Sequence, residues 1–299
     1  MSNAAPVVAI VGPTASGKSA LAMSIAERLG AEVVNADAFC LYRGMDIGTA
    51  KPSPSDRRRV VHHLIDTHDV EESVEVVGYR DQARAAIEAV RSRGRTPLLV
   101  GGSGLYVQAV LDDLRFPGTD PSVRQRLEGE LAQVGPEVLH GRLAAIDPAA
   151  AEAILPSNGR RIVRALEVNE ITGASFVATL GPAQPWTRSV RIGWDPGQEA
   201  VDRAIAARVD LMWRDGFVGE VESLRERLTR ARTASRAVGY RQILDALEAG
   251  DDPDAAREPT VVATRRLARR QRAWFRRDPR VHWLQSSSQV EQILGTLEI

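Results

Sequence analysis

Residues able to do chemistry lie near the start of the chain, in the segment Gly12-Pro-Thr-Ala-Ser-Gly-Lys-Ser19. It fits the pattern G-x-x-x-x-G-K-[ST] and joins an apolar run, residues 7–11, to a run with helical spacing, residues 18–29. In such a loop, backbone N–H groups and the helix N-terminus face phosphate oxygens, Lys18 neutralises charge and Ser19 is able to ligate Mg²⁺. The pattern predicts a diphosphate cradle formed by Gly12, Pro13, Thr14, Ala15, Ser16, Gly17, Lys18 and Ser19.

Two further polar residues follow apolar runs that are typical of strands. Asp37 comes after residues 32–35, and Ser103 comes after residues 96–100 and two glycines. In an open α/β sheet, catalytic groups commonly lie at the carboxyl ends of the strands. The residue types leave alternatives open, because Asp37 would also serve as a helix N-cap or a Mg²⁺ ligand, and Ser103 as a turn or cap residue.

Helices must alternate with these strands to position the polar groups. Residues 78–93 are predicted to form a helix that ends at Gly94, directly before the strand at 96–100. Alternation of this kind implies a parallel sheet with helices on both sides. The sequence therefore predicts an α/β fold with a P-loop NTPase-like parallel sheet flanked by helices.

The pattern changes from about Pro117, because no strand-like run appears until residues 190–192 and the interval holds helical patterns separated by prolines. We expect an all-helical insertion domain at 117–187 within a P-loop core domain formed by 1–116 and 188–299. The second part of the core contains predicted helices at 201–228 (one or two), 238–247 and 260–276, the last rich in arginine, and a short strand at 281–284.

The composition of the 299 residues, 43% of them hydrophobic, indicates an ordinary globular protein. No apolar run reaches the roughly 18 residues of a membrane span, and residues 1–6 lack a secretory pattern, so we expect a cytoplasmic protein without membrane contact. The lone Cys40 has no partner for an intramolecular disulfide or a zinc site. The five histidines show no metal-binding spacing, and His62 and His63 are expected in a loop or an edge strand.

The formal net charge is zero, which argues against non-specific coating of nucleic acid. The charges are nevertheless clustered. Arginines gather at 160–164, 230–241 and 265–280. They are candidates for phosphate contacts, although arginines also serve to solvate helix faces. Only Lys18 and Lys51 are lysines, which suggests that these positions need a compact ammonium group.

Several blocks downstream of the P-loop carry a family resemblance. They include Asn35-Ala-Asp-Ala-Phe-Cys-Leu-Tyr-Arg-Gly-Met-Asp-Ile-Gly-Thr-Ala-Lys-Pro52 and Pro97-Leu-Leu-Val-Gly-Gly-Ser-Gly-Leu-Tyr106. Together with the P-loop, these segments resemble the tRNA dimethylallyltransferases, also called tRNA isopentenyltransferases or IPP transferases. Residues 161–168, 237–242 and 264–275 look like later blocks of that family, so the resemblance extends from the first strand to about Trp283.

The resemblance implies transfer of a dimethylallyl group from dimethylallyl diphosphate to the exocyclic N6 amine of the adenine 3′ of the anticodon in tRNA, with release of diphosphate and with Mg²⁺ as cofactor. In the family, the aspartate corresponding to Asp37 accepts a proton from this weakly nucleophilic amine. Ser103 stands where the family commonly has threonine, whose hydroxyl meets the oxygen that bridges carbon and phosphorus. Asp37, Ser103 and Lys18 are thus the predicted catalytic residues, the last two on the leaving-group side.

The resemblance also implies contacts with a tRNA anticodon stem-loop, whose target base must leave its stack to reach a buried carboxylate. We expect the adenine to lie between core and insertion, and the enzyme to be a monomer. After the aspartate, the family often has Ser-x-Gln, whereas this chain has Ala38-Phe39-Cys40. For Arg43 and Lys51, the sequence leaves two contacts open, one with the donor phosphate and one with the tRNA backbone. The predicted tRNA-binding residues are Asp37, Ala38, Phe39, Cys40, Arg124, Arg160, Arg161, Ile162, Val163, Arg164, Arg236, Gly239, Tyr240, Arg241, Arg270, Gln271 and Trp274.

Other functions remain open at this point. The P-loop alone would suit an ATP-dependent kinase of a small metabolite, or an RNA-binding protein that uses the loop as a switch. A prenyltransferase acting on free adenine nucleotides is a closer alternative. The arginine clusters favour a macromolecular acceptor over both small-molecule enzymes.

Overall fold

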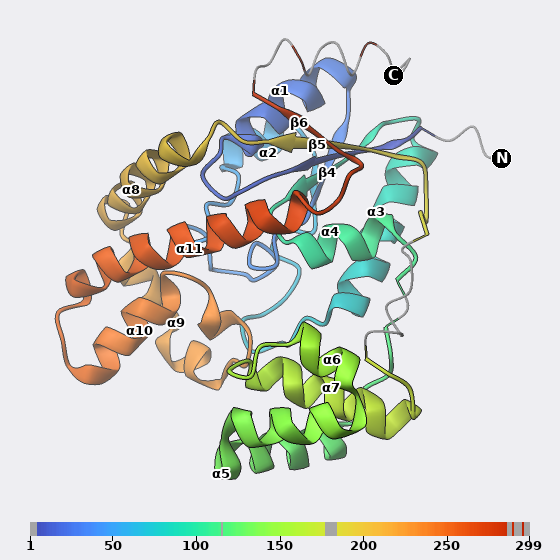
Figure 1. Ribbon diagram of the computed structural model, residues 1–299. Coiled ribbons are helices and arrows are strands. Elements are labelled where there is room, and N and C mark those ends of the chain that lie inside the picture. Colours follow the sequence, from blue (N-terminus) through green and yellow to red (C-terminus); the bar gives the residue numbers. More distant parts are fainter. Residues whose placement is uncertain (1–4, 115, 177–183, 286–288, 290–294, 296–299) are drawn as a thin grey trace. The chain divides into compact units, whose positions relative to one another are not determined.

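The computed structural model describes residues 5–114, 116–176, 184–285, 289 and 295 (Figure 1). The chain forms two compact units, one made of residues 1–111 and 186–299 and the other of 112–185. The sequence pattern predicts the second unit at residues 117–187. The second unit is longer because its two connections run antiparallel, with Asp112 bridged to Pro185 and the Asp113 amide donating to the Gln184 carbonyl at 2.6 Å.

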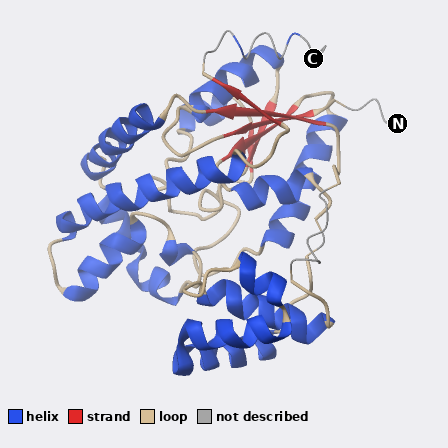
Figure 2. Cartoon of the chain, in the orientation of Figure 1, coloured by secondary structure: helices blue, strands red, loops and turns tan. Residues whose placement is uncertain are grey.

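The first unit is built on a six-stranded sheet in the order β3-β2-β4-β1-β5-β6 (Figure 2). All neighbouring strands pair in parallel. This confirms the predicted parallel sheet. The strands are β1 (Val7–Val11), β2 (Glu32–Asn35), β3 (His62–His63), β4 (Pro97–Gly101), β5 (Ser189–Trp194) and β6 (Val281–Leu284).

Each face of the sheet buries alternate side chains of its strands, because successive residues of a strand point to opposite faces. Val7, Ala9 and Val11 pack against α3 (Val76–Ser92) and α4 (Gly104–Leu111). Val8 and Ile10 pack on the other face against α1 (Lys18–Leu29). With both faces covered, the central strands β1 and β4 are continuously apolar rather than alternating. The predicted arrangement of helices on both sides is confirmed.

The remaining helices of the first unit form a second layer of packing beside the sheet (Figure 1). The predicted helical stretch 201–228 is two helices, separated at Gly216. Tyr42, Met45, Phe217 and Tyr240 are fully buried in one core of this layer. These helices are α8 (Gln198–Arg214), α9 (Phe217–Arg230), α10 (Tyr240–Ala249) and α11 (Arg257–Phe275), with 3-10 turns at Ala234–Arg236 and Pro253–Ala256. The exception is the short α2 (Pro54–Arg59), which lies beside α1 and is followed by Val60 in the core on that face of the sheet.

The second unit is helical in its described residues, with α5 (Pro121–Ile146), α6 (Pro148–Ala153) and α7 (Gly159–Thr172). Proline begins α5 and α6, where its missing N–H costs nothing, and Asp120 and Asp147 cap these helices. Pro136 lies within α5, after a break in helical geometry at Gly135. Among the described residues, no helix combines the length and apolarity needed to cross a bilayer.

Candidate functional site

The P-loop follows β1 at the carboxyl edge of the sheet and leads into α1. Gly12 must be glycine here, since its φ is 151° and a Cβ atom would lie 2.3 Å from the carbonyl oxygen of Trp194 on β5. The Trp194 indole donates a hydrogen bond to the Ser16 carbonyl at 2.8 Å, and Lys18 Nζ donates to the Pro13 carbonyl at 3.1 Å. The loop is therefore fixed by its neighbours into an open turn of backbone amides.

Arg208 of α8 lies against this loop, although it is not among the residues that the sequence pattern predicts. Its Nη1 donates to the Thr14 hydroxyl at 3.2 Å. A signal exists in the sequence, because Ile205, Arg208, Val209 and Met212 occupy one face of a helix and the other three are buried. An arginine on the apolar stripe of an amphipathic helix is a buried charge that needs a partner.

Near the P-loop, two buried polar atoms lack hydrogen-bond partners among the described residues, and two cations, Lys18 and Arg208, lie near each other. Among the described residues, nothing accepts a hydrogen bond from the buried Nε of Arg208, and the buried Ser16 hydroxyl has no partner. Burial lowers the pKa of Lys18 to about 8 and lowers the pKa of Arg208, while nearby Asp37 acts in the opposite direction on both. Two cations held close together in a dry site favour an anion with several oxygen atoms.

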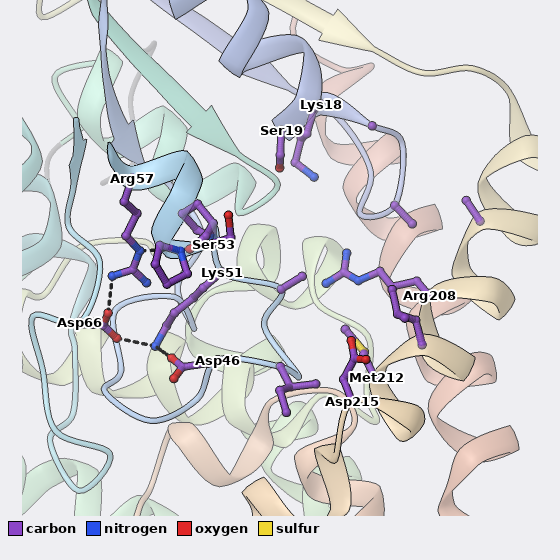
Figure 3. Close-up of a pocket in the computed structure, with 18 residues that line it drawn as sticks. Lys18, Ser19, Asp46, Lys51, Ser53, Arg57, Asp66, Arg208, Met212 and Asp215 are labelled. Atoms are coloured by element: carbon purple, nitrogen blue, oxygen red, sulfur yellow. Dashed lines mark hydrogen bonds and ion pairs between the residues drawn. The ribbon is translucent and has the colours of Figure 1, made fainter. Parts of the chain in front are cut away.

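A cavity of about 910 Å³ opens from the P-loop, and Figure 3 shows the side chains around it. Lys18 and Ser19 line it together with Arg208. Across the cavity lies a group of ion-paired residues, which we call the Lys51 cluster: Asp46, Lys51, Arg57 and Asp66.

Asp37 and Ser103 come together with the P-loop because they follow β2 and β4, which are adjacent in the sheet. The Ala38 amide donates to the Ser103 hydroxyl at 3.4 Å. Asp37 Oδ1 accepts from the Phe39 amide at 3.0 Å, and among the described residues no donor is within reach of its second oxygen. Asp37, Lys18 and Arg208 line one cavity of about 540 Å³.

A smaller, mainly apolar cavity of about 60 Å³ adjoins Asp37. Asp37, Arg208 and several threonines, Thr14 among them, are its polar lining residues, and the α8 residues Ile205 and Val209 are among its apolar walls. A carboxylate thus borders both a cationic cradle and a small apolar space. This arrangement can hold a short hydrocarbon group attached to a phosphate.

Three predicted tRNA contacts on α11 lie in different surroundings. Gln271 Oε1 accepts a hydrogen bond from the Thr14 amide at 2.7 Å, so its side chain is committed to the P-loop. The Trp274 indole packs directly on Gly104, beside Ser103, and is 42% exposed. Arg270 is exposed. Trp274 and Arg270 are therefore exposed to a large partner, whereas Gln271 is partly buried.

Other predicted tRNA contacts have buried side chains. Tyr240 is fully buried, and its hydroxyl donates to Glu220 rather than facing solvent. Ile162 and Val163 lie in the core of the second unit because they occupy the inner face of α7. Cys40 is also buried, and burial raises the pKa of its thiol well above the usual value. Tyr240, Ile162 and Val163 are core residues whose side chains do not face solvent, while Cys40 lines the 540 Å³ cavity together with Asp37.

Arg124 and Arg164 of the second unit converge on one carboxylate, the fully buried Glu167. Each lies 2.7 Å from Glu167 Oε2, and burial of the carboxylate is offset by these partners, so the pKa of Glu167 is lowered. Two guanidinium groups around one carboxylate leave a net positive charge. The predicted contacts at Arg160, Arg161, Arg236 and Arg241 are exposed, while Gly239 is buried.

Lys51 and Arg43, for which the sequence left contacts with either the donor phosphate or the tRNA backbone open, both pair with residues of the protein. Lys51 Nζ, 2% exposed, donates to the Tyr42 carbonyl, Asp46 and Asp66 at 2.5–2.7 Å, which uses all three of its N–H groups. Arg43 pairs with Asp69 at 3.2 Å. A compact ammonium is needed at position 51 because three acceptors converge on it.

The chain is similar over most of its length to a set of known proteins. A family model described as IPP transferase matches residues 40–278. The tRNA dimethylallyltransferase of Kineococcus radiotolerans is 58% identical over 287 residues, which cover 93% of this chain and 90% of that protein. The protein of the same name from Salinispora arenicola is 57% identical, covering 95% and 83%. The solved full-length tRNA isopentenylpyrophosphate transferase of Bacillus halodurans is 37% identical, with a TM-score of 0.72 and coverage of 98% and 97%.

Proposed function

As this chain belongs to the IPP transferase family and is thus a transferase, we propose that it transfers the dimethylallyl group of dimethylallyl diphosphate to the exocyclic N6 amine of the adenine 3′ of a tRNA anticodon. One observation carries the proposal. Thr14 of the P-loop, Arg208 and Asp37 line both a polar cavity and a small, mainly apolar one at the carboxyl edge of one sheet, and Ser103 accepts a hydrogen bond from the Ala38 amide beside Asp37. The small-metabolite kinase gains no support, since the relatives named above are tRNA-modifying transferases.

The leaving group is stabilised from the P-loop side. As the allylic C–O bond breaks, negative charge collects on diphosphate, and the backbone amides, Lys18 and Arg208 are preorganised to receive it. The Nε of Arg208 and the hydroxyl of Ser16 are buried at the P-loop and have no partner among the described residues. The Ser103 hydroxyl, close to the Asp37 segment, donates to the oxygen that bridges carbon and phosphorus.

The site fits Mg²⁺ on the chemistry of its donors. Ser19 is exposed in the first turn of α1 and lines the same cavity as Lys18. Mg²⁺ usually keeps several waters and binds one or two protein oxygens together with substrate phosphates, so one hydroxyl beside a diphosphate cradle is sufficient. When bound, it would neutralise part of the charge on the departing diphosphate.

The acceptor is activated at Asp37. The lone pair of the adenine amine is delocalised into the ring, so a carboxylate that accepts its proton raises its nucleophilicity as the C–N bond forms. One oxygen of Asp37 is held by the Phe39 amide, which fixes the carboxylate orientation. The second oxygen is then available for the amine proton.

Exposed arginines supply the RNA surface of the proposed enzyme. Arg160, Arg161, Arg236, Arg241 and Arg270 are exposed, and the exposed Trp274 adjoins the Ser103 loop. Guanidinium groups hold phosphates, while an aromatic face stacks on an unpaired base. A tRNA acceptor also makes the cytoplasm the proposed location.

The test is transfer of label from radioactive dimethylallyl diphosphate to an unmodified anticodon stem-loop in the presence of Mg²⁺. Wild type should label the RNA, and Asp37→Ala should lower the rate by a factor on the order of 10²–10⁴. A parallel reaction contains ATP and no prenyl donor. ATP consumption without labelled RNA would establish the kinase and overturn the proposal.

A further inference from the structure

Glu220 of α9 holds a turn that lies far from it in the sequence. Its Oε2 accepts hydrogen bonds from the backbone amides of Asp46 and Ile47 at 2.9 and 2.7 Å, and its Oε1 accepts from the Gly48 amide at 3.2 Å. The Tyr240 hydroxyl also donates to Oε1. Four donors nearly exhaust the acceptor capacity of one carboxylate. We call residues 46–49 the Glu220-bound turn.

The turn is pressed against two aromatic rings. A Cβ atom at Gly48 would lie 2.2 Å from the Phe217 ring and 2.4 Å from the Tyr240 ring. These rings are themselves packed edge to face, with centroids 4.9 Å apart. Only glycine lets the backbone approach closely enough for its amide to reach Glu220. The carboxylate and the aromatic pair thus fix the turn in one position.

The same turn forms a wall of the small cavity beside Asp37. Gly48 and Thr49 line this 60 Å³ cavity together with Asp37 and Phe39. Thr49 is tied further, since its hydroxyl donates to the Met45 carbonyl at 2.5 Å and its own carbonyl accepts from the Cys40 thiol at 3.7 Å. A shift of the turn would therefore change the width of the space that faces the reacting carboxylate.

We infer that Glu220 is a positioning residue for prenyl transfer, which acts through the Glu220-bound turn to set the wall of the cavity beside Asp37. The inference rests on the proposed function. Glu220 touches neither the P-loop nor Asp37, so its effect reaches the reaction through geometry. Small displacements of groups that bound a reaction space lower the rate of the chemical step more than they weaken binding of the donor.

Glu220→Gln tests this with little change in size. An amide retains one acceptor oxygen and turns an NH₂ donor toward backbone N–H groups, so part of the anchoring is lost. The matched control is Glu226→Gln on the same helix, where an exposed carboxylate pairs only with Arg230. We expect Glu220→Gln to lower kcat for label transfer about tenfold to a hundredfold, with the KM for dimethylallyl diphosphate within about twofold of wild type.

Cys40 supplies a second readout, because it is the sole cysteine of the chain and lies under the turn. Its alkylation rate in the folded protein should rise at least about tenfold in Glu220→Gln and stay unchanged in Glu226→Gln. Tyr240→Phe, which removes one of the four donors, should change both readouts in the same direction by a smaller factor. Tyr240→Phe also tests the inference if Glu220→Gln does not fold.

The outcomes separate the inference from the proposed function. If wild type transfers no label to RNA, the proposed function fails. If wild type transfers label while folded Glu220→Gln and Tyr240→Phe keep wild-type kcat, the inference is overturned. A lowered thermal midpoint with normal kcat and a protected Cys40 would likewise overturn it, since Glu220 would then be a structural residue alone.

Discussion

At the scale of single residues, the site is defined by charged groups whose partners are incomplete. Arg208 is partly buried near Lys18, and its buried Nε has no acceptor in the described part of the chain. The Lys51 ammonium, by contrast, is saturated by three acceptors. Arg208 can therefore still donate to a ligand, whereas all donors of Lys51 are used in contacts within the protein.

Arg208→Lys should weaken donor binding while the fold is kept. Lysine retains the charge but lacks the planar fork, so it cannot present donors in the fixed directions by which the guanidinium reaches Thr14 and a phosphate. Loss of a charge-assisted hydrogen bond costs about 1.5–3 kcal/mol, which corresponds to roughly a tenfold to hundredfold rise in KM for dimethylallyl diphosphate. Arg214→Lys, at the exposed end of the same helix, is the control. A normal KM in Arg208→Lys would contradict the assigned contact.

Ser103 offers a test of the leaving-group side. Ser103→Ala should lower the single-turnover rate by about 10²–10³, because one preorganised donor to the developing charge is removed. Ser103→Thr keeps the hydroxyl and should retain activity within a few-fold. Equal rates for Ser103→Ala and wild type would show that the hydroxyl acts only in the turn.

At the scale of elements, the sheet brings the chemistry together and side-chain pairs hold its helices in place. Asp195, which follows β5, accepts from Arg272 of α11 at 2.5 and 2.8 Å. Gln271, the neighbouring residue on α11, reaches the Thr14 amide. The helix that carries the densest arginine cluster is thereby fixed to the P-loop.

The ion pair of Glu32, the first residue of β2, can be tested through the pH dependence of stability. Glu32 is buried, and Arg93 Nη2 and His63 Nε2 lie 2.6 and 2.7 Å from its Oε2. The hydrogen bond from Arg93 holds the pKa of Glu32 below its ordinary value of 4.5, although burial acts in the opposite direction. Because the folded pKa is the lower one, the pair stabilises the fold above the unfolded pKa, and this stabilisation disappears as pH falls through the folded pKa.

Glu32→Gln should therefore lower the thermal midpoint at pH 7 by about 2–4 °C for each kcal/mol of stability removed. The gap from wild type should close as the pH falls through the folded pKa of Glu32, which lies below 4.5, because the wild-type carboxyl then becomes protonated. Calorimetry across this range measures both. The control is Glu88→Gln, whose exposed carboxylate pairs with Arg91. A gap that is constant from pH 7 to pH 3 would refute the assignment.

At the scale of the whole molecule, a net charge of zero conceals a segregated surface. Two arginines meet one carboxylate at Glu167, and Arg160 and Arg161 are exposed on the same helix. Positive charge is therefore concentrated at this helix. RNA binding by such a surface depends on salt through release of counterions.

Replacing Arg160 and Arg161 with alanine should weaken binding of an anticodon stem-loop and flatten its salt dependence. The slope of log K against log salt should fall in magnitude by about 0.7–0.9 for each phosphate that the variant no longer neutralises. Fluorescence anisotropy of labelled RNA at several salt concentrations measures this. The KM for dimethylallyl diphosphate should stay unchanged, and Arg203→Ala on the exposed face of α8 should leave the slope intact. An unaltered slope in the double variant would remove these arginines from the RNA surface.

The sequence alone determined the P-loop, the two polar residues after β2 and β4, the parallel sheet and the family. These features depend on short segments, since strand, loop and helix signals are local and parallel strands bring their carboxyl ends to one edge. The family resemblance also implied Tyr240, Ile162 and Val163 as tRNA contacts, and the fold buries their side chains.

Only the tertiary structure decided which charges face a ligand and which are satisfied within the protein. Arg208 meets Thr14 across 194 positions of sequence, and Glu220 meets the Asp46 amide across 174. Whether a guanidinium or carboxylate is free depends on neighbours that the chain brings together only when it folds. Burial then sets how strongly each unpaired charge demands a partner, because desolvation is a property of the packed molecule rather than of any segment.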